Sequence, residues 1–218
     1  MPVTIHKTAE VSSEAKIGQG TKIWHYSQVL AGAQIGENCT IGHNCFIAST
    51  AKIGNGVKLE SNIDVWDLVT LEDYVFVGPS VVFTNDLMPR AKYPKKDFPQ
   101  YGQWLPTLVK EGASIGANAT IICGSVVGKW AFIGAGAVVK GIVPDYAVMA
   151  GVPAKQIGWM CECGSKLAFK PIKPAKAVKL NKLTKLTKQG NEEAKCVICG
   201  REYEKIDNQV GEVSKGND

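Results

Sequence analysis

The chain has 218 residues, of which 45% are hydrophobic, so it is long enough for one main domain with a buried core and a small appendage. No apolar run approaches the roughly 20 residues that a membrane-spanning helix needs, and no basic leader precedes an apolar stretch, so we expect a cytoplasmic protein without membrane contact. The net charge of +5 lies mainly in residues 159–218, with 12 Lys and Arg against 8 Asp and Glu, and therefore gives little support for nucleic-acid binding by the main domain.

A six-residue repeat occupies most of residues 1–158. An aliphatic or aromatic residue stands at every sixth position from Ile5 to Phe83, and the spacing resumes from Val109 to Val139. This period excludes an α-helix, because 3.6 residues per turn would move the stripe around the cylinder. It fits short strands joined by tight corners, three strands to a coil, with one large side chain per strand pointing inward. We therefore predict an all-β fold, a parallel β-helix.

The other positions of the repeat agree with this prediction. Two residues before each large side chain the residue is small, and Cys39 and Cys45 stand at this position, so we expect them in the core. Glycine often follows the large residue directly, as at Gly18, Gly36 and Gly42. Because corners need backbone angles that glycine, asparagine and aspartate tolerate, we expect these glycines at the corners.

The repeat is interrupted at residues 84–108, which we expect to form one long loop insertion. A loop of this length inside a compact repeat is usually functional. It carries the polar residues Asn85, Asp86 and Arg90 beside several aromatic residues. A loop that packs on a neighbouring subunit is the alternative, and the two roles are compatible.

Residues 18 positions apart should stack on adjacent coils, about 4.8 Å from each other. His25 and His43 have this spacing and should share one edge of the prism, whereas Asp67 and Asn85 should share another. Such polar columns are also found as solvated corners, and that alternative remains open for the histidines.

The composition changes after Gly158, so we expect a main domain of residues 1–158 and a tail of residues 159–218. The tail holds Cys161, Cys163, Cys196 and Cys199 as a CxCG and a CxxCG motif separated by 32 residues. Two close pairs of thiolates, each followed by glycine, are typical of a structural Zn²⁺ site. We predict a small zinc-ribbon-like appendage, and we expect Cys123 to be structural.

Lysine recurs at every third position between the two cysteine pairs. A solvated face is favoured over a polyanion-binding surface, because the aromatic residues that accompany nucleic-acid surfaces are nearly absent, and we expect no nucleic-acid partner. The repeated lysines are Lys170, Lys173, Lys176, Lys179, Lys182, Lys185 and Lys188.

Four segments place the chain near known enzymes: KIWHYSQVLAGAQIGENCTIGHNCFI, GPSVVFTNDLMPR, TLVKEGASIGANATIICG and AVMAGVPAKQIGWM. They resemble, in this order, the nucleotide-sugar N-acetyltransferases of the hexapeptide-repeat acyltransferase family. The resemblance implies a left-handed parallel β-helix of hexapeptide repeats, a homotrimer with active sites between subunits, and acetyl-CoA as cosubstrate. Its nearest branch acetylates UDP-2-acetamido-3-amino-2,3-dideoxyglucuronic acid, and dTDP-3-amino-3,6-dideoxyhexose N-acetyltransferases are the alternative.

The resemblance also suggests roles for residues. It places Asn85 next to the amine that is acetylated, and Asp86, Arg90 and Asp67 are further candidates for substrate binding. His25 or His43 could accept the proton, because histidine is the side chain most often used for this transfer. A dedicated base is not required if the sulfur of coenzyme A takes the proton.

Coenzyme A is expected on the last coils. Gly134, Ala135 and Gly136 leave the backbone uncovered, so the pantetheine arm could run along it. The GVPAK segment matches the end of the acyltransferase domain, where Lys155 could meet a phosphate, and Lys140 is a second candidate.

Two other functions remain as alternatives. A hexapeptide carbonic anhydrase would need three histidines around a metal, and His6, His25 and His43 all lie in the first coils with a spacing that fits poorly. A non-catalytic β-helix scaffold would bind a polyanion through its lysines. Coenzyme A binding distinguishes the enzyme from both.

Overall fold

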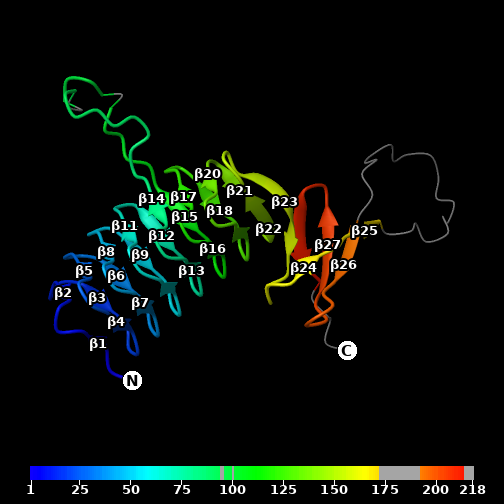
Figure 1. The fold of residues 1–218 in the computed structure, drawn as a ribbon, viewed down its shortest axis with the longest axis horizontal. Coiled ribbons are helices and arrows are strands. Elements are labelled where there is room, and N and C mark those ends of the chain that lie inside the picture. Colours follow the sequence, from blue (N-terminus) through cyan, green and yellow to red (C-terminus); the bar gives the residue numbers. More distant parts are fainter. Residues whose placement is uncertain (94–95, 100, 172–191, 214–218) are drawn as a thin grey trace, which may run out of the picture.

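The computed structural model of the protein describes residues 1–93, 96–99, 101–171 and 192–213. The chain winds as a β-solenoid whose coils present three flat faces, here called faces A, B and C (Figure 1). Along the solenoid each strand pairs in parallel with the strand one coil later, as Thr4 pairs with Lys22. The all-β parallel β-helix predicted from the six-residue period is confirmed.

The strands of each face follow the solenoid axis in order. Face A is formed by β1 (Thr4–Ile5), β4 (Lys22–Ile23), β7 (Thr40–Ile41), β10 (Lys58–Leu59), β13 (Phe76–Val77), β16 (Ser114–Ile115), β19 (Phe132–Ile133) and β22 (Ala147–Ala150). Face B is formed by β2 (Glu10–Val11), β5 (Gln28–Val29), β8 (Phe46–Ile47), β11 (Asp64–Val65), β14 (Val82–Phe83), β17 (Thr120–Ile121) and β20 (Val138–Val139). Face C is formed by β3 (Lys16–Ile17), β6 (Gln34–Ile35), β9 (Lys52–Ile53), β12 (Val69–Leu71), β15 (Thr107–Val109), β18 (Val126–Val127) and β21 (Ile142–Val143).

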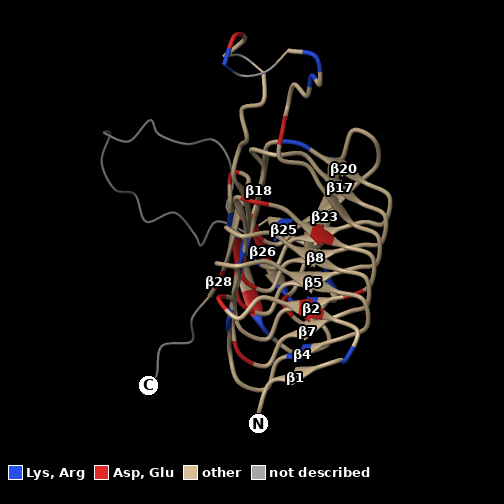
Figure 2. Ribbon diagram, turned by 90° about the vertical axis from the view of Figure 1, so that its left-hand side faces the viewer, with Lys and Arg blue, Asp and Glu red and all other residues tan. Residues whose placement is uncertain are grey.

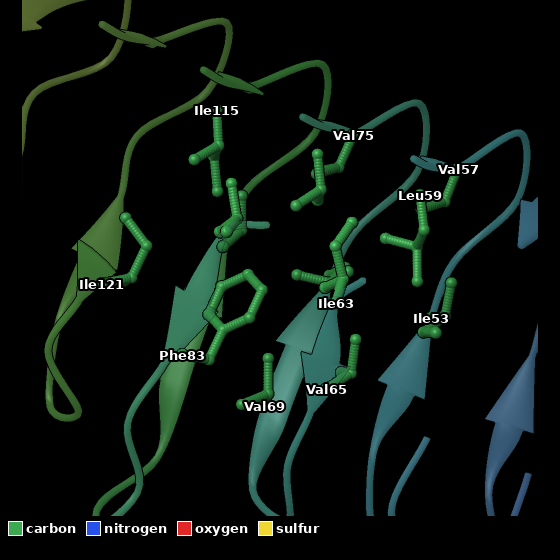
Figure 3. Close-up of a cluster of buried hydrophobic side chains, with 14 of the residues drawn as sticks. Ile53, Val57, Leu59, Ile63, Val65, Val69, Val75, Phe83, Ile115 and Ile121 are labelled. Carbon is green, nitrogen blue, oxygen red and sulfur yellow. The ribbon is translucent and has the colours of Figure 1, made fainter. Parts of the chain in front are cut away.

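The large residue of each hexad fills the interior of the solenoid. Figure 3 shows Ile53, Leu59 and Phe83 pointing inward from successive faces, and all are buried. Cys39 and Cys45 are buried in the same core, as expected. Burial raises the pKa of the Cys45 thiol to about 11, so this thiol stays protonated at neutral pH and serves the packing of the core.

The corners follow the prediction in part, because residues such as Asn38 and Gly20 have the left-handed backbone, but the glycines that directly follow the large residue do not. Gly18, Gly36 and Gly42 do not have a positive φ; a Cβ on Gly18 would instead lie 2.5 Å from the backbone nitrogen of Glu37 on the next coil. The left-handed residue stands two positions after such a glycine, for example Asn38 at φ 55°. The glycines are therefore required by close stacking of coils, and other residues make the turn.

The long loop leaves the solenoid after β14 and returns at β15, so it ends two residues before the predicted limit of 108 (Figure 1). Leu71 pairs with Ile53 on one side and with Val109 on the other, so the coil register continues across the insertion. Within the loop, the rings of Tyr93 and Phe98 pack edge to face at 4.8 Å.

The tail begins as a continuation of face A. Strand β23 (Lys155–Met160) pairs antiparallel with β22 and crosses the expected boundary at residue 158, and β24 (Lys166–Leu167) follows it. A separate antiparallel sheet then stands at the end of the solenoid (Figure 1), formed by β25 (Lys170–Pro171), β26 (Glu192–Lys195), β27 (Glu202–Ile206) and β28 (Gln209–Glu212). Among the described residues, no helix has the length and apolar character needed to cross a membrane.

Candidate functional site

Asn85 stands at the point where the solenoid ends and the loop begins. The preceding Thr84 still donates its backbone N–H to Ile121 on the next coil, at 3.1 Å. The carbonyl of Asn85 accepts a hydrogen bond from the backbone nitrogen of Leu105 at 3.0 Å. The half-buried side chain is therefore carried by backbone that is fixed on both sides of the loop neck.

Asp86 closes the same neck. It forms an isolated antiparallel bridge with Trp104, and its Oδ1 accepts a hydrogen bond from the backbone nitrogen of Met88 at 2.8 Å. Further out, the exposed guanidinium of Arg90 lies 5.8 Å from the centre of the Tyr101 ring and donates to the carbonyl of Pro89. The predicted polar residues Asn85, Asp86 and Arg90 thus follow one another along the first part of the loop as it leaves the solenoid.

Asp67 lies at the corner between faces B and C, as Asn85 does one coil later, in agreement with the 18-residue spacing. Its Oδ1 accepts hydrogen bonds from the backbone nitrogen of Thr50 at 2.9 Å and from the Thr50 hydroxyl at 2.8 Å. These contacts stabilise the corner, so any contact of Asp67 with a substrate would have to use its other carboxylate oxygen.

The histidines lie at a different corner, between faces A and B. Asn44 donates its backbone N–H to the carbonyl of His25, which links the coils that carry His25 and His43. The Nδ1 of His43 lies 2.7 Å from the Ser61 hydroxyl, an interaction that leaves Nε2 of His43 for another partner. Ser61 was missed by sequence reasoning, although it stands 18 positions after His43 and the stacking rule could have found it.

His25 has a different environment. Its ring lies against that of His6, with the ring centres 3.7 Å apart. Desolvation and the nearby charges of His25 and Lys7 lower the pKa of His6. Face B separates this histidine corner from the corner of Asn85, so one chain does not bring the candidate base and Asn85 together.

The candidate coenzyme A residues lie on the last coils. Gly134 donates its backbone N–H to the carbonyl of Met149, and an added Cβ on Gly136 would meet no atom within 4 Å. Ala135 is exposed and lies on the same corner as His25 and His43, several coils further along. At this corner Ala135 and Gly136 are exposed, whereas Gly134 is half-buried.

The two candidate phosphate-binding lysines are both exposed. Lys140 follows β20 at the corner between faces B and C, and Lys155 begins β23, where it pairs with Ala150. The structure thus distributes the predicted coenzyme A residues over two corners and a terminal strand of the same end of the solenoid.

The four tail cysteines come together, as the motif spacing predicted. The sulfur atoms of Cys161, Cys163, Cys196 and Cys199 lie within 4.8 Å of one another. Hydrogen bonds from backbone N–H groups lower the pKa of Cys196 to about 6, whereas burial raises the pKa of Cys161 to about 12. In the part of the chain that the structure describes, this is the group of side chains suited to a metal, and no group of three histidines accompanies it.

The lysine repeat of the tail falls largely outside the described residues. Lys170 lies on β25, whereas Lys173, Lys176, Lys179, Lys182, Lys185 and Lys188 lie in residues 172–191 and are not described. On the solenoid itself, Figure 2 shows acidic and basic positions interspersed.

Comparison with known proteins supports the repeat. The family described as bacterial transferase hexapeptide (six repeats) matches residues 14–49 and 106–141. The chain is 52% identical over 63 residues to a dTDP-3-amino-3,6-dideoxy-alpha-D-galactopyranose 3-N-acetyltransferase from Aneurinibacillus thermoaerophilus, which is 29% of this chain and 33% of that protein. It is 55% identical over 47 residues to a serine acetyltransferase from Haemophilus influenzae, covering 22% of this chain and 18% of the relative.

A solved structure supports the architecture. The chain is similar to LpxA, a UDP-N-acetylglucosamine acyltransferase from Bacteroides fragilis, with a TM-score of 0.53 and 16% identity over 72% of this chain and 61% of that one. This likeness concerns the fold. The aligned segment spans about a third of the length of the first curated relative, so the likeness in sequence is confined to part of each protein.

Proposed function

We propose that this chain is an acetyl-CoA-dependent N-acetyltransferase that acts on the amino group of a nucleotide-linked amino sugar. The observation that carries the proposal is the 52% identity to a dTDP-amino-sugar N-acetyltransferase, on a chain whose hexapeptide coils hold Asn85 at the neck of a long loop. This relative favours a dTDP-linked 3-amino-3,6-dideoxyhexose as substrate over the UDP-linked glucuronic acid derivative that the sequence motifs suggested first.

Acetyl transfer from acetyl-CoA to an amine requires few groups of the protein. A neutral amine attacks the thioester carbon, an oxyanion forms, and the thiolate of coenzyme A leaves. The enzyme has to orient the amine and supply an N–H to the oxyanion. The side-chain carbonyl of Asn85 suits the first task, because it can accept a hydrogen bond from the amine and so direct its lone pair.

The histidine corner suits proton transfer from the amine. His43 is the better candidate of the two, because the Ser61 hydroxyl binds Nδ1 and so orients the ring, whereas His25 packs on His6. Since face B separates this corner from Asn85 within one chain, the proposed site combines the Asn85 corner of one subunit with the histidine corner of a neighbour.

We therefore expect a homotrimer. Face B carries exposed apolar side chains for such contact: Val82 is 50% exposed, and Trp66 packs on Phe46 at 5.2 Å between ring centres. Light scattering should give three times the chain mass of 23.4 kDa at micromolar concentration. Val82→Lys should weaken the assembly, because it places a charge in the apolar contact, whereas Gln34→Lys on face C should not. A stable monomer would contradict the prediction.

The substrate is tested by a panel of amino-sugar nucleotides, each incubated with acetyl-CoA while release of the free thiol is followed. The panel should pair dTDP and UDP carriers and 3-amino and 4-amino sugars, because each pair changes one feature at a time. We expect fastest release with a dTDP-linked 3-amino-3,6-dideoxyhexose. Absence of both coenzyme A binding and thiol release over the whole panel would refute the proposed activity.

A further inference from the structure

The four tail cysteines come from two turns that are far apart in sequence. Cys161 and Cys163 follow β23, and Cys196 and Cys199 follow β26. The Sγ atoms of Cys161 and Cys199 are 3.4 Å apart, and those of Cys163 and Cys196 are 3.6 Å apart, so each sulfur has its near neighbour in the other turn. A tetrahedral centre with Zn–S distances of about 2.3 Å has sulfur–sulfur edges of about 3.8 Å. The sulfurs are therefore already close to this geometry.

Both turns have the same backbone closure. Gly164 donates its N–H to the carbonyl of Cys161 at 2.8 Å, and Gly200 donates to the carbonyl of Cys196 at 3.0 Å. These glycines have φ values of +84° and +75°, which few other residues adopt without strain. The first turn is one residue shorter than the second in sequence, yet it presents its two sulfurs to the same point.

A charged group stands beside the cysteine cluster. Arg201 follows the second turn, two positions after Cys199. It bridges Glu162 in the first turn, at 3.2 Å, and Glu212 on β28, at 3.5 Å. A tetrathiolate around Zn²⁺ carries two negative charges, so a guanidinium at this position would stabilise it and keep the two turns together.

The cysteine cluster is connected to the end of the solenoid. The Sγ of Cys161 lies 3.1 Å from the hydroxyl of Tyr203, which is 1% exposed. The Tyr203 ring packs edge to face on Tyr146, with 5.2 Å between ring centres. Tyr146 forms a corner of the last coil, and Trp130 from the preceding coil packs on the same apolar cluster.

We propose that Cys161, Cys163, Cys196 and Cys199 bind one Zn²⁺ per chain, and that this centre is a clasp that holds the tail sheet against the last coil. The open end of a solenoid exposes its core and needs a cap. Here the tail provides the cap, and the metal joins the strand that leaves the solenoid to the sheet that covers it. The proposal is independent of acetyl transfer, which should survive metal loss as long as the assembly stays intact.

The metal is tested first on the full chain. Protein purified without chelator should contain about one zinc per chain by elemental analysis, and Co²⁺ added to the metal-free chain should give the visible absorption of a tetrahedral thiolate site. Cys196→Ser combined with Cys199→Ser should abolish both signals. The matched control is Val197→Ser, which changes an exposed residue of the same turn and should retain both. Absence of zinc together with absence of the Co²⁺ spectrum would overturn the metal site.

The clasp is tested by hydrogen exchange of the intact chain with and without zinc. Because metal removal should release the tail, amide exchange in residues 142–167 is expected to become roughly tenfold faster or more, while residues 40–65 should be unchanged. Tyr203→Ala should give the same acceleration in residues 142–150 while zinc is still bound, because it removes the ring that contacts Tyr146. Unchanged exchange at residues 142–150 after zinc removal would overturn the clasp even if zinc binds.

Discussion

Replacing Asn85 with alanine is expected to lower kcat/KM for the amino-sugar nucleotide by roughly 10- to 1000-fold, about 1.4–4 kcal/mol of transition-state stabilisation. The expectation follows from the proposed role of its side-chain carbonyl in directing the amine. Binding of acetyl-CoA should change little, because the candidate coenzyme A residues lie on later coils. Steady-state thiol release and calorimetric titration of acetyl-CoA measure the two effects separately.

The controls for this prediction separate chemistry from folding. Gln34→Ala removes an exposed amide on face C and should leave kcat/KM unchanged. His43→Ala should cost as much as Asn85→Ala if His43 is the base, and less if the amine enters neutral, and His25→Ala should cost less than His43→Ala. Unchanged turnover of the Asn85→Ala enzyme on its best substrate would remove Asn85 from the proposed mechanism.

Gly42→Ala is expected to destabilise the fold by about 3 kcal/mol, near the upper end of what overpacking usually costs. A Cβ at this position would lie 2.3 Å from the carbonyl oxygen of Glu60 and 3.0 Å from that of Leu59. These are backbone atoms of the next coil, so the clash cannot be relieved by turning a side chain. Chemical denaturation, followed by circular dichroism, measures the loss.

Gly158→Ala is the matched control. An added Cβ on this glycine meets nothing within 4 Å, and its φ lies outside the left-handed region, so the free energy of unfolding should change by no more than about 0.5 kcal/mol. Equal stability of the Gly42→Ala and Gly158→Ala proteins would show that the coils can separate locally without cost.

The fold could be predicted because the six-residue period determines which side chains point into the solenoid. A residue such as Ile41 is large because its side chain fills the interior, and this requirement returns every six positions, so a single sequence displays it many times. The role of the glycines that follow the large residues differs from the expectation for a physical reason. The sequence shows where glycine occurs but not why. Gly18 is required because Gly36 and Glu37 of the next coil lie too close for a side chain, whereas the residue with the positive φ stands two positions later.

The candidate site was predictable only in part. Stacking at 18 residues placed His43 and Asn85 on two different edges of the prism, and the structure shows face B between these edges. Contacts such as Tyr203 with Cys161 join segments about 40 residues apart that follow no period, so no repeat could indicate them. In the tail, only the cysteine spacing predicts the structure.

The continuity of the coil across the long loop has a consequence for how such a protein can change. Leu71 pairs with Val109 on the next coil in the same way as it pairs with Ile53 on the previous coil. The length of the segment inserted between Leu71 and Val109 therefore does not change the strand pairing. The hydrogen bond between Asn85 and Leu105 closes the loop neck. The segment between these two residues can therefore be lengthened, shortened or exchanged without displacing a coil. Evolution and protein engineering can thus revise the outer loop as an interchangeable module, with the frame that presents it left intact.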